Sequence, residues 1–361
     1  MKRIVFTVTN DLTYDQRMNR ICSTLQAAGY DITLIGFMKK RSVKLEQKPY
    51  KQIRLNLFFV KGKLFYLEYN FRLFWYLIFN KYDIYTGIDL DTLLPVYLNA
   101  KIKGKPCVYD AHEYFTELPE IVARPLIKKM WIKLEKFLLP KIKYNYTVGN
   151  AIAEELSSKY KTTFNVIRNV PILTDEQTGP AQGNYILYQG ALNMGRGLEA
   201  LMEAMADVNA ELFIAGEGDL SAELRAFAAA LPHKEKIRFL GYVRPADLKK
   251  YTNEAKIGVN LVEHLGLSYY YSLSNKFFDY IHAGIPQVTM NFPEYKNLNE
   301  QYQVAVLIDE PIKKLIATAI NELLTDEKLY YQLRQNTKTA KQDLNWQKES
   351  LKLIQIYQKI E

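Results

Sequence analysis

The chain has 361 residues, of which 48% are hydrophobic and 24% charged, a balance that excludes a disordered chain and supplies apolar material for two globular domains. No apolar run approaches the ~18 residues that span a bilayer, and the two cysteines, Cys22 and Cys107, lack the spacing of a zinc site, so we expect a reduced, cytoplasmic protein. Residues 1–180 carry 28 Lys and Arg against 17 Asp and Glu, a net charge of +11, whereas residues 181–361 carry 20 against 22, a net charge of −2. We therefore expect the first half to bind an anionic partner, which can be nucleic acid, an anionic membrane or a phosphate-bearing substrate.

Short apolar strands alternate with helices along the first half of the chain. The first strand follows Lys2 and Arg3 directly, without the apolar run of a signal peptide. This alternation predicts βαβ units on a parallel sheet, in a first domain over residues 1–170. The predicted strands are Ile4–Val8, Asp31–Phe37, Asp83–Thr86, Pro106–Tyr109, Tyr144–Val148 and Phe164–Ile167, and the first predicted helix is Tyr14–Ala28.

A polar stretch over residues 168–184 interrupts this rhythm and is predicted to be an interdomain linker, because it holds Pro171, Gly179, Pro180 and Gly183. A second Rossmann-like domain is expected over residues 171–344, with a ligand at the carboxyl ends of the strands, between the domains. Its predicted strands are Tyr185–Gln189, Glu211–Ala215, Ile237–Leu240, Ile257–Leu261 and Pro286–Met290, and its predicted helices are Gly197–Ala206, Leu220–Ala230, Pro245–Thr252 and Asn275–Ala283.

The stretch over residues 61–81 interleaves aromatic and cationic side chains. This composition predicts an interfacial patch for an anionic membrane; the alternative is one buried helix face flanked by solvated lysines. No RNA- or DNA-binding motif accompanies it, so we expect no nucleic-acid partner. The other side chains that give the first domain a basic, aromatic character are Arg124, Lys128, Lys129, Trp131, Lys133 and Lys136.

The sequence Asp89-Leu90-Asp91 has the spacing of a DxD metal site. It comes where a helix is predicted to begin, and acidic residues there cap the first turn and complement the helix dipole. We therefore expect no metal at this position. Asp89 remains a candidate for contacting an acceptor.

His112 follows the predicted strand that leads into Asp110, and it lies beside Asp110 and Glu113. A histidine at a strand's carboxyl end can contact a sugar or a phosphate, so His112 and Asp110 are predicted to be catalytic. Either Asp110 or Glu113 would orient the imidazole or an acceptor hydroxyl. The alternative is a buried histidine whose hydrogen bonds are satisfied.

The loop 189–198 is rich in glycine, follows a strand and opens a helix. Gly190, Gly195 and Gly197 would let the backbone approach a ligand, the helix N-terminus would offer free N–H groups to a phosphate, and Arg196 would add a bidentate donor. An ordinary glycine-rich turn with a surface arginine is an equally good interpretation of this loop alone.

A second glycine loop, over residues 215–219, places Gly216 and Glu217 at the end of the next strand. Because this GxG turn lies at a strand's carboxyl end in the same domain, its position favours a role in ligand binding. A tight turn with Asp219 as the helix N-cap would explain the same residues.

The segment 272–286 leads from a serine-rich loop into a helix that carries Asn275 and Lys276 in its first turn. A cation at this end of a helix opposes the dipole, so Lys276 suggests a bound anion. Asp279 lies one turn later on the same face and would accept hydrogen bonds from ribose hydroxyls. The alternative is a surface salt bridge between Lys276 and Asp279.

These segments together resemble the donor half of the retaining GT-B glycosyltransferases of family 4 (glycosyl transferases group 1), of the bacterial surface-polysaccharide type. That family shows G-R-L-x-x-x-K-G, then G-x-G, then a glutamate-rich loop ending in K-x-x-E-Y-x-x-x-G-x-P-V. Arg196 stands at the family's lysine position, Lys276 and Asp279 stand at its diphosphate and ribose positions, and Gly284 and Pro286 match its closing turn. The motifs at 14–17 and 109–113 resemble its acceptor domain, and the segment 345–359 resembles its long last helix.

The resemblance implies two Rossmann-like domains facing each other across a cleft, with the last helix, about residues 345–361, crossing back to the first domain. It implies transfer of a sugar from a UDP- or GDP-sugar to a lipid-linked or polysaccharide acceptor, with retention and without a metal or cofactor. A peripheral position on the inner face of the cytoplasmic membrane would suit such an acceptor. The resulting assignments are His112, Asp110, Arg196 and Lys276 as catalytic residues, Gly190, Gly195, Gly197, Gly216, Glu217, Tyr242, Val243, Glu263, Ser274, Asn275 and Asp279 as donor-binding residues, and Asp11, Arg17, Asp89 and Glu113 as acceptor-binding residues.

Two positions depart from the family pattern. Ala191 stands where the family often has an arginine, and Tyr271 stands where the first glutamate of its E-x7-E pair contacts sugar hydroxyls, a role that Glu263 would take over. These departures leave two other classes open. One is a sugar-nucleotide epimerase of the same fold, using the carboxylates and imidazole at 110–113, and the other is a non-catalytic nucleotide-sugar-binding protein.

Overall fold

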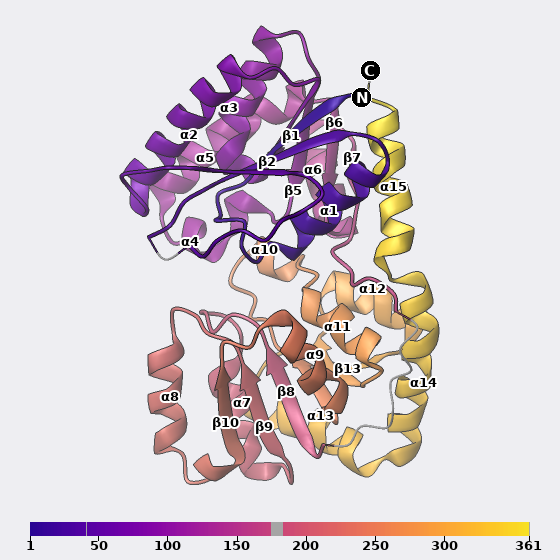
Figure 1. Ribbon diagram of the computed structural model, residues 1–361. Coiled ribbons are helices and arrows are strands. Elements are labelled where there is room, and N and C mark those ends of the chain that lie inside the picture. The colour runs from indigo at the N-terminus through magenta and orange to yellow at the C-terminus, as the bar shows by residue number, and fades with distance from the viewer. Residues whose placement is uncertain (41, 175–182, 361) are drawn as a thin grey trace. The chain divides into compact units, whose positions relative to one another are not determined.

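The computed structural model describes residues 1–40, 42–174 and 183–360, so the part of the predicted linker that holds Gly179 and Pro180 lies outside the described residues. The chain forms two compact units (Figure 1), Met1–Asn169 with Lys348–Glu361, and Val170–Gln347.

The first unit contains a seven-stranded sheet in which every pair of neighbouring strands is parallel, in the order β3-β2-β1-β4-β5-β6-β7. This confirms the expected βαβ organisation. The strand β3 was not predicted, because its polar residues break the apolar run that marks a buried strand. It lies at the edge of the sheet and pairs with β2 alone. The strands are β1 (Arg3–Thr7), β2 (Asp31–Phe37), β3 (Lys51–Leu55), β4 (Ile84–Ile88), β5 (Cys107–Ala111), β6 (Tyr144–Thr147) and β7 (Phe164–Val166).

Helices cover both faces of this sheet. On one face, α2 packs through Phe65, Tyr69, Leu73 and Leu77, which recur every four residues and therefore share one side of the helix. The helices of this unit are α1 (Gln16–Ala27), α2 (Gly62–Phe79), α3 (Asp89–Ile102), α4 (Pro119–Val122), α5 (Pro125–Leu138), α6 (Asn150–Tyr160) and most of α15 (Trp346–Gln358).

The last helix packs on the first unit through several buried residues, among them the aromatic Tyr357. The Tyr357 ring lies 6.0 Å from that of Phe6 and 6.4 Å from that of Tyr146, measured between centroids. The Tyr357 hydroxyl lies 3.1 Å from the Thr86 hydroxyl. The end of the chain therefore completes the core of the domain that holds its beginning.

The aromatic stretch of α2 is divided between the interior and the surface. Phe65, Tyr69 and, on α5, Trp131 are buried, so the prediction that they belong to a surface patch is wrong for these three residues. Lys128, also predicted in the patch, pairs with Glu117 at 2.7 Å.

The second unit contains a six-stranded parallel sheet in the order β10-β9-β8-β11-β12-β13. The strand β13 was not predicted, because four apolar residues show no periodicity that separates a strand from a buried turn of helix. The strands are β8 (Tyr185–Gln189), β9 (Glu211–Ala215), β10 (Ile237–Gly241), β11 (Ile257–Asn260), β12 (Gln287–Met290) and β13 (Ala305–Ile308). The helices are α7 (Leu198–Ala204), α8 (Ser221–Ala230), α9 (Pro245–Glu254), α10 (Leu267–Tyr270), α11 (Asn275–Ala283), α12 (Pro293–Tyr302), α13 (Lys313–Thr325) and α14 (Glu327–Asp343).

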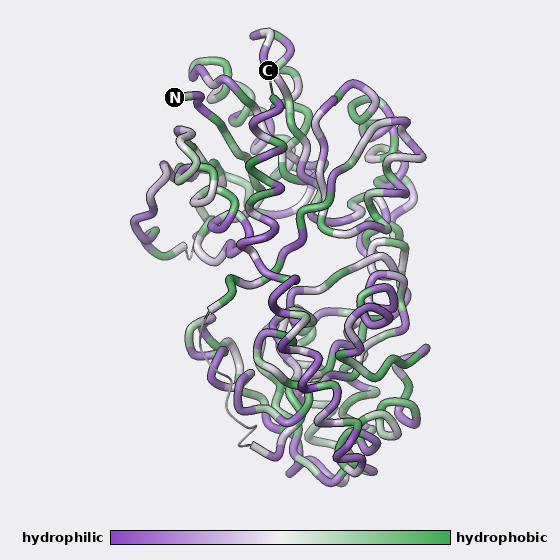
Figure 2. Tube along the Cα trace, turned by 90° about the vertical axis from the view of Figure 1, so that its right-hand side faces the viewer, coloured by the Kyte–Doolittle hydropathy of each residue, from purple (hydrophilic) through white to green (hydrophobic). Residues whose placement is uncertain are grey.

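Both sheets change direction of strand order once, between β1 and β4 in the first unit and between β8 and β11 in the second. Ligands of open parallel sheets bind outside the carboxyl ends of the strands at such a switch point. The helices around the sheets alternate between hydrophobic and hydrophilic residues (Figure 2), and none in the described parts of the chain combines the length and apolarity needed to cross a membrane.

Candidate active site

Two glycine loops touch at the switch point of the second unit. A Cβ atom on Gly216 would lie 1.8 Å from the Gly190 carbonyl oxygen, and Gly216 has φ +152°, so only glycine permits this contact. The Gly190 amide donates to the Ala215 carbonyl at 3.0 Å, which ties the two loops together at the ends of β8 and β9. The two predicted loops therefore form one continuous backbone surface.

Lys276 lies against this surface and is buried. Its Nζ is 4.0 Å from the centre of the Tyr188 ring, and a Cβ atom on Gly190 would be 3.2 Å from it. Burial, together with the nearby Arg196 guanidinium, lowers the pKa of Lys276 well below its ordinary value, and Asp279 offsets this only in part. An anion beside Lys276 would favour its charged form.

Arg196 sits in the loop that precedes α7. Its guanidinium lies over the Tyr269 ring at 4.7 Å, which favours one orientation of this planar group. A Cβ atom on Gly195 would lie 2.6 Å from the Leu265 side chain, and the φ of +77° would strain any other residue there. The loop is thus packed onto the segment that follows β11.

At the N-terminus of α7, the Gly197 amide is bonded to a carboxylate. The Gly197 amide donates to the Glu263 carboxylate at 3.3 Å, and the Glu263 amide donates to the Gly195 carbonyl at 3.0 Å. The helix has only seven residues and its N-terminal amide is already partnered. Glu263 is therefore bonded to both ends of the segment Gly195–Gly197, and the phosphate contact expected at this helix end stays a prediction.

Asp279 is oriented by a chain of polar groups at the end of β8. Gln189 Nε2 donates to the Asp279 carboxylate at 2.9 Å, and the Thr252 hydroxyl donates to Gln189 Oε1 at 2.7 Å. The Ser274 hydroxyl likewise donates to Asn260 Oδ1 at 2.9 Å, whereas Asn275 is exposed in the first turn of α11. Gln189 and Asn260 were not predicted, although each is a polar residue that ends an otherwise apolar strand.

The remaining predicted donor residues lie at the ends of β9 and β10. The Glu217 carboxylate pairs with Arg225 at 2.6 Å. A hydrogen bond from Ser221, and after it this ion pair, lowers the pKa of Glu217. Tyr242 is exposed, and Val243 is partly buried against the core of the second unit. This group is close to the glycine loops, since the Gly216 amide donates to the Gly241 carbonyl at 2.8 Å.

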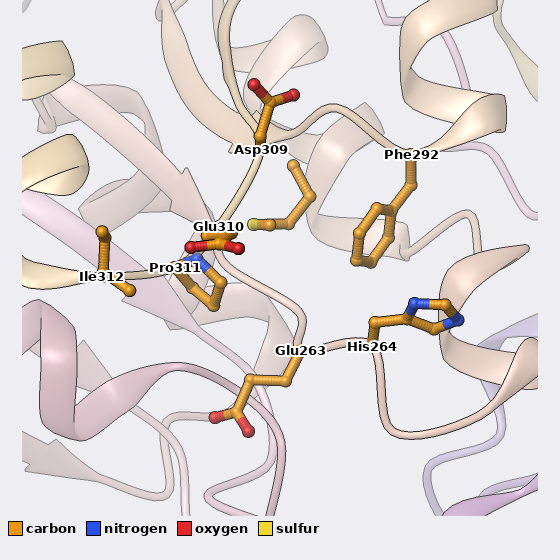
Figure 3. Close-up of a pocket in the computed structure, with 8 residues that line it drawn as sticks. Glu263, His264, Phe292, Asp309, Glu310, Pro311 and Ile312 are labelled. Atoms are coloured by element: carbon orange, nitrogen blue, oxygen red, sulfur yellow. The ribbon is translucent and has the colours of Figure 1, made fainter.

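A cavity of about 370 Å³ lies beyond the carboxyl ends of β11, β12 and β13. Among the residues predicted to bind the donor, Glu263 lines it. Figure 3 shows the Glu263 and His264 side chains leaving the same loop in different directions. The other lining residues are Met290, Phe292, Asp309, Glu310, Pro311 and Ile312.

The first unit brings Arg17, Asp110 and His112 into one hydrogen-bonded row. Arg17 Nη2 donates to Asp110 Oδ1 at 3.0 Å, and His112 Nε2 lies 2.9 Å from Asp110 Oδ2. Burial opposes the charge on Asp110, but Arg17 and His112 outweigh it and hold the pKa of Asp110 below its ordinary value. Burial also opposes the charge on His112, but Asp110 outweighs it and raises the pKa of His112.

Asp89 and Asp91 lie in the first turn of α3 as predicted, but neither caps the helix. Asp89 Oδ1 accepts a hydrogen bond from the His112 amide at 2.8 Å, and Asp91 Oδ2 accepts one from the Thr9 hydroxyl at 2.6 Å. Desolvation raises the pKa of Asp89 to about 8 and that of Asp91 to about 6. Asp89 has φ +53°, a left-handed conformation that costs an L-residue about 1–2 kcal/mol and that clusters at functional sites.

The other residues predicted to bind an acceptor are distributed unevenly. Asp11 accepts from the Ser42 hydroxyl at 2.9 Å and is partly exposed, and Glu113 is exposed beside His112. Arg17 is 5% exposed, and both of its terminal nitrogens donate inside the unit, so it offers almost no surface to an acceptor. Within the described residues, no group of three or more His, Cys, Asp or Glu side chains is arranged to hold a metal ion.

Family models match both units. Residues 16–172 match the model described as Glycosyltransferase Family 4, and residues 172–340 match the model described as Glycosyl transferases group 1. Over 123 residues the chain is 30% identical to "Uncharacterized glycosyltransferase MJ1607" of Methanocaldococcus jannaschii. That match spans 33% of this chain and 30% of the curated relative's length.

Solved structures resemble the chain over its whole length. Sucrose-phosphate synthase from Thermosynechococcus elongatus has a TM-score of 0.80 at 16% identity, over 99% of this chain and 98% of that one. Anabaena Alr3699/HepE in complex with UDP-glucose has a TM-score of 0.78 at 13% identity, over 100% of both chains. At these identities the likeness concerns the fold, and it confirms the expected GT-B class.

Proposed function

Because the chain carries a glycosyltransferase family 4 domain followed by a glycosyl transferases group 1 domain, we propose that it transfers a sugar from a nucleotide-diphosphate sugar to a glycan or lipid-linked acceptor. The observation that carries this proposal is Lys276, a buried lysine whose pKa is lowered by burial beside the glycine loops. A diphosphate at this position would supply negative charge in addition to that of Asp279. Lys276 and Arg196 would then hold the leaving group.

The proposed reaction retains the configuration of the transferred sugar. The bond between the sugar C1 atom and the diphosphate oxygen breaks, and a bond from C1 to the acceptor oxygen forms on the same face. The acceptor's proton passes to the leaving diphosphate. The cations Lys276 and Arg196 stabilise the negative charge that grows on that group, which is the main catalytic device of the second unit. They supply positive charge without a metal ion, so the proposed reaction is metal-independent.

The first unit is proposed to bind the acceptor and to hold His112 against a substrate hydroxyl. Its candidate acceptor contacts are Asp11, Asp89 and Glu113, which are at least partly accessible. UDP is the preferred nucleotide in this proposal, since Anabaena HepE, which shares the fold, binds UDP-glucose. The loop that carries Tyr271 in place of a glutamate would select the sugar.

The exposed side of α2 favours a membrane-bound acceptor, of the surface-polysaccharide precursor type. One stripe of this helix is apolar and 45–78% exposed, although the opposite stripe is also apolar and buried. A helix that is apolar all round is normally covered on all sides. The exposed stripe consists of Leu64, Leu67, Phe71, Trp75 and Phe79.

The neighbouring helix α5 adds positive charge to this surface. Its Trp131 ring lies 5.9 Å from the Tyr66 ring of α2, so the two helices are in contact. On its exposed side the apolar Leu126, Met130 and Phe137 alternate with Lys129, Lys133 and Lys136. Apolar insertion combined with lysines fits the interface of an anionic bilayer. We therefore propose that the enzyme docks on anionic membrane through the exposed faces of α2 and α5.

A panel of nucleotide sugars tests the proposed reaction. The purified protein is incubated with a series of UDP-sugars and GDP-sugars, one at a time, together with an extract of glycan acceptors. The products are then separated by chromatography. We expect release of the nucleoside diphosphate from one donor with a glycosylated acceptor. An isomerised donor would indicate an epimerase, and binding without turnover of any donor would indicate a sensor, so either result would overturn the proposal.

A further inference from the structure

We propose that Arg17, Asp110 and Asp89 are positioning residues that hold the His112 ring in one orientation, with Nδ1 as the ring atom presented to substrate. This inference deepens the proposed function, and it assigns Arg17 and Asp110 roles inside the protein in place of direct contact with substrate. It concerns four residues that come from three different elements, α1, α3 and the end of β5.

Arg17 provides the fixed end of this row. Its Nη1 donates to the Ile167 carbonyl at 3.0 Å, just after β7, while its Nη2 donates to Asp110 Oδ1 at 3.0 Å. Two bonds from one planar guanidinium determine both its position and its plane. The side chain is 5% exposed, so its positive charge acts on Asp110 and not on solvent.

Asp110 transmits this orientation to the imidazole. The residue is fully buried in β5, and each carboxylate oxygen has its own partner, Arg17 on one side and His112 Nε2 at 2.9 Å on the other. An ionised carboxylate only accepts hydrogen bonds, so the His112 proton resides on Nε2 whenever the ring is neutral. In the described residues Nδ1 has no hydrogen-bond partner, and the His112 side chain is 20% exposed.

Asp89 fixes the backbone of His112. Its Oδ1 accepts from the His112 amide at 2.8 Å, and its left-handed backbone conformation directs the side chain back from α3 to the turn after β5. The ring is therefore held at Nε2 and the backbone at the amide nitrogen, which leaves one ring orientation. A strained backbone conformation of this kind, next to an imidazole, is typical of functional sites.

The charges around His112 make the arrangement measurable. Asp110 from β5 and Asp89 from α3 favour the imidazolium, and Arg17 from α1 disfavours it. Asp91 from α3 and the adjacent Glu113 complete the charged surroundings. Removing Asp110 or Arg17 should therefore shift the titration of His112 in opposite directions, which a purely structural role of these residues in the core would not require.

The test follows the four histidine Cε1–H resonances by NMR as pH is varied, with His112→Gln to assign the relevant signal. In Asp110→Asn the pKa of His112 should fall, and in Arg17→Met it should rise. Each variant should lose about 10- to 100-fold in kcat with little change in donor KM, as expected when a reacting group is misplaced. Arg17→Lys keeps the charge and should recover part of the loss.

Arg20→Met is the matched control, because Arg20 lies one turn later on α1 and donates to Asn169. It should leave both the His112 titration and kcat unchanged. If Arg17→Met fails to fold, Arg17→Lys and Asp110→Asn decide the matter. An unshifted His112 signal in Asp110→Asn, or equal effects of Arg17→Met and Arg20→Met, would overturn the proposal. The titration needs no substrate, so an absence of sugar transfer by the wild type would reject the proposed function and leave this test intact.

Discussion

The Lys276 ammonium group lies 4.0 Å from the centre of the Tyr188 ring, and any side chain on Gly190 would come within 3.3 Å of the end of Lys276. The lysine is therefore enclosed by an aromatic ring on one side and a bare backbone loop on the other. Burial and Arg196 lower its pKa, and Asp279 is the acidic group that acts in the opposite direction. The proposal that Lys276 binds a diphosphate rests on this enclosure.

Replacing Lys276 should weaken UDP binding. Lys276→Met removes the buried cation and should cost ~1.5–3 kcal/mol, or about 10- to 150-fold in Kd, the range for a charge-assisted hydrogen bond. Calorimetric titration with UDP measures the change. Lys256→Met is the control, since Lys256 also lies over an aromatic ring, Tyr330 at 4.2 Å, but just before β11, at its amino end. Equal affinities for UDP in wild type and Lys276→Met would show that the diphosphate binds elsewhere.

Gly216→Ala should abolish donor binding by separating the two glycine loops. The new Cβ atom would lie 1.8 Å from the Gly190 carbonyl oxygen, a distance that the backbone must relieve by moving. Gly104→Ala is the matched control, because Gly104 also has positive φ but has open space around it. That control should lose about 1–2 kcal/mol of stability and keep its UDP affinity. Normal UDP titration by Gly216→Ala would contradict the assignment of these loops.

The stability of the protein should fall as pH rises from about 4 to about 8, in part because of Asp89. Its pKa in the folded state is raised to about 8 by desolvation, so the unfolded chain releases this proton at lower pH than the folded chain. The contribution is present below the unfolded pKa and is lost as pH rises through the folded pKa, with a slope of up to about 1.4 kcal/mol per pH unit. His112, whose pKa is also raised, acts in the same direction.

Asp89→Asn isolates this contribution, because the amide oxygen still accepts from the His112 amide while the ionisable group is gone. Urea unfolding at pH 5, 6, 7 and 8 should give a flatter profile for the variant than for the wild type. Parallel profiles would mean that Asp89 ionises at an ordinary pH in the folded protein.

The sequence was sufficient to predict the strands of both sheets except β3 and β13, but not the contacts that complete the site. β1, β2, β8 and β9 are apolar runs bounded by polar or glycine residues, which local patterning detects. The pairing of Arg17 with Asp110 joins residues 93 positions apart, and that of Glu263 with Gly197 joins residues 66 apart. No local periodicity encodes such pairs, so Arg17 was expected at an acceptor and Glu263 at a sugar. Among the contacts of Arg17, Asp110 and His112, only the one between Asp110 and His112 could be expected from the sequence, because these two residues are two positions apart.

Docking on a membrane should have two separable components. The triple variant Lys129→Gln, Lys133→Gln and Lys136→Gln should lose the salt-sensitive part, at about 1 kcal/mol per lysine near the surface. Co-sedimentation with phosphatidylglycerol vesicles and with phosphatidylcholine vesicles, at low and high salt, measures this part. Binding that is equal on both vesicle types would argue against electrostatic docking.

The double variant Phe71→Ser and Trp75→Ser should lose the part of vesicle binding that persists at high salt, because it removes apolar side chains from the exposed face of α2. Tyr331→Ser serves as the control, since Tyr331 is an exposed aromatic residue on α14 of the second unit. If the control reduces binding as much as the α2 variant does, the α2 face is not the docking surface.

The most direct test of the proposed sugar transfer is the rate of UDP release from a UDP-sugar panel in excess EDTA, measured for the wild type and for Lys276→Met. We predict release with at least one donor, at a rate unchanged by EDTA and reduced about 100-fold or more in the variant, because Lys276 is proposed to act on the charge that grows in the transition state. No UDP release from any donor, a strict requirement for a divalent metal, or equal rates for the two proteins would contradict it.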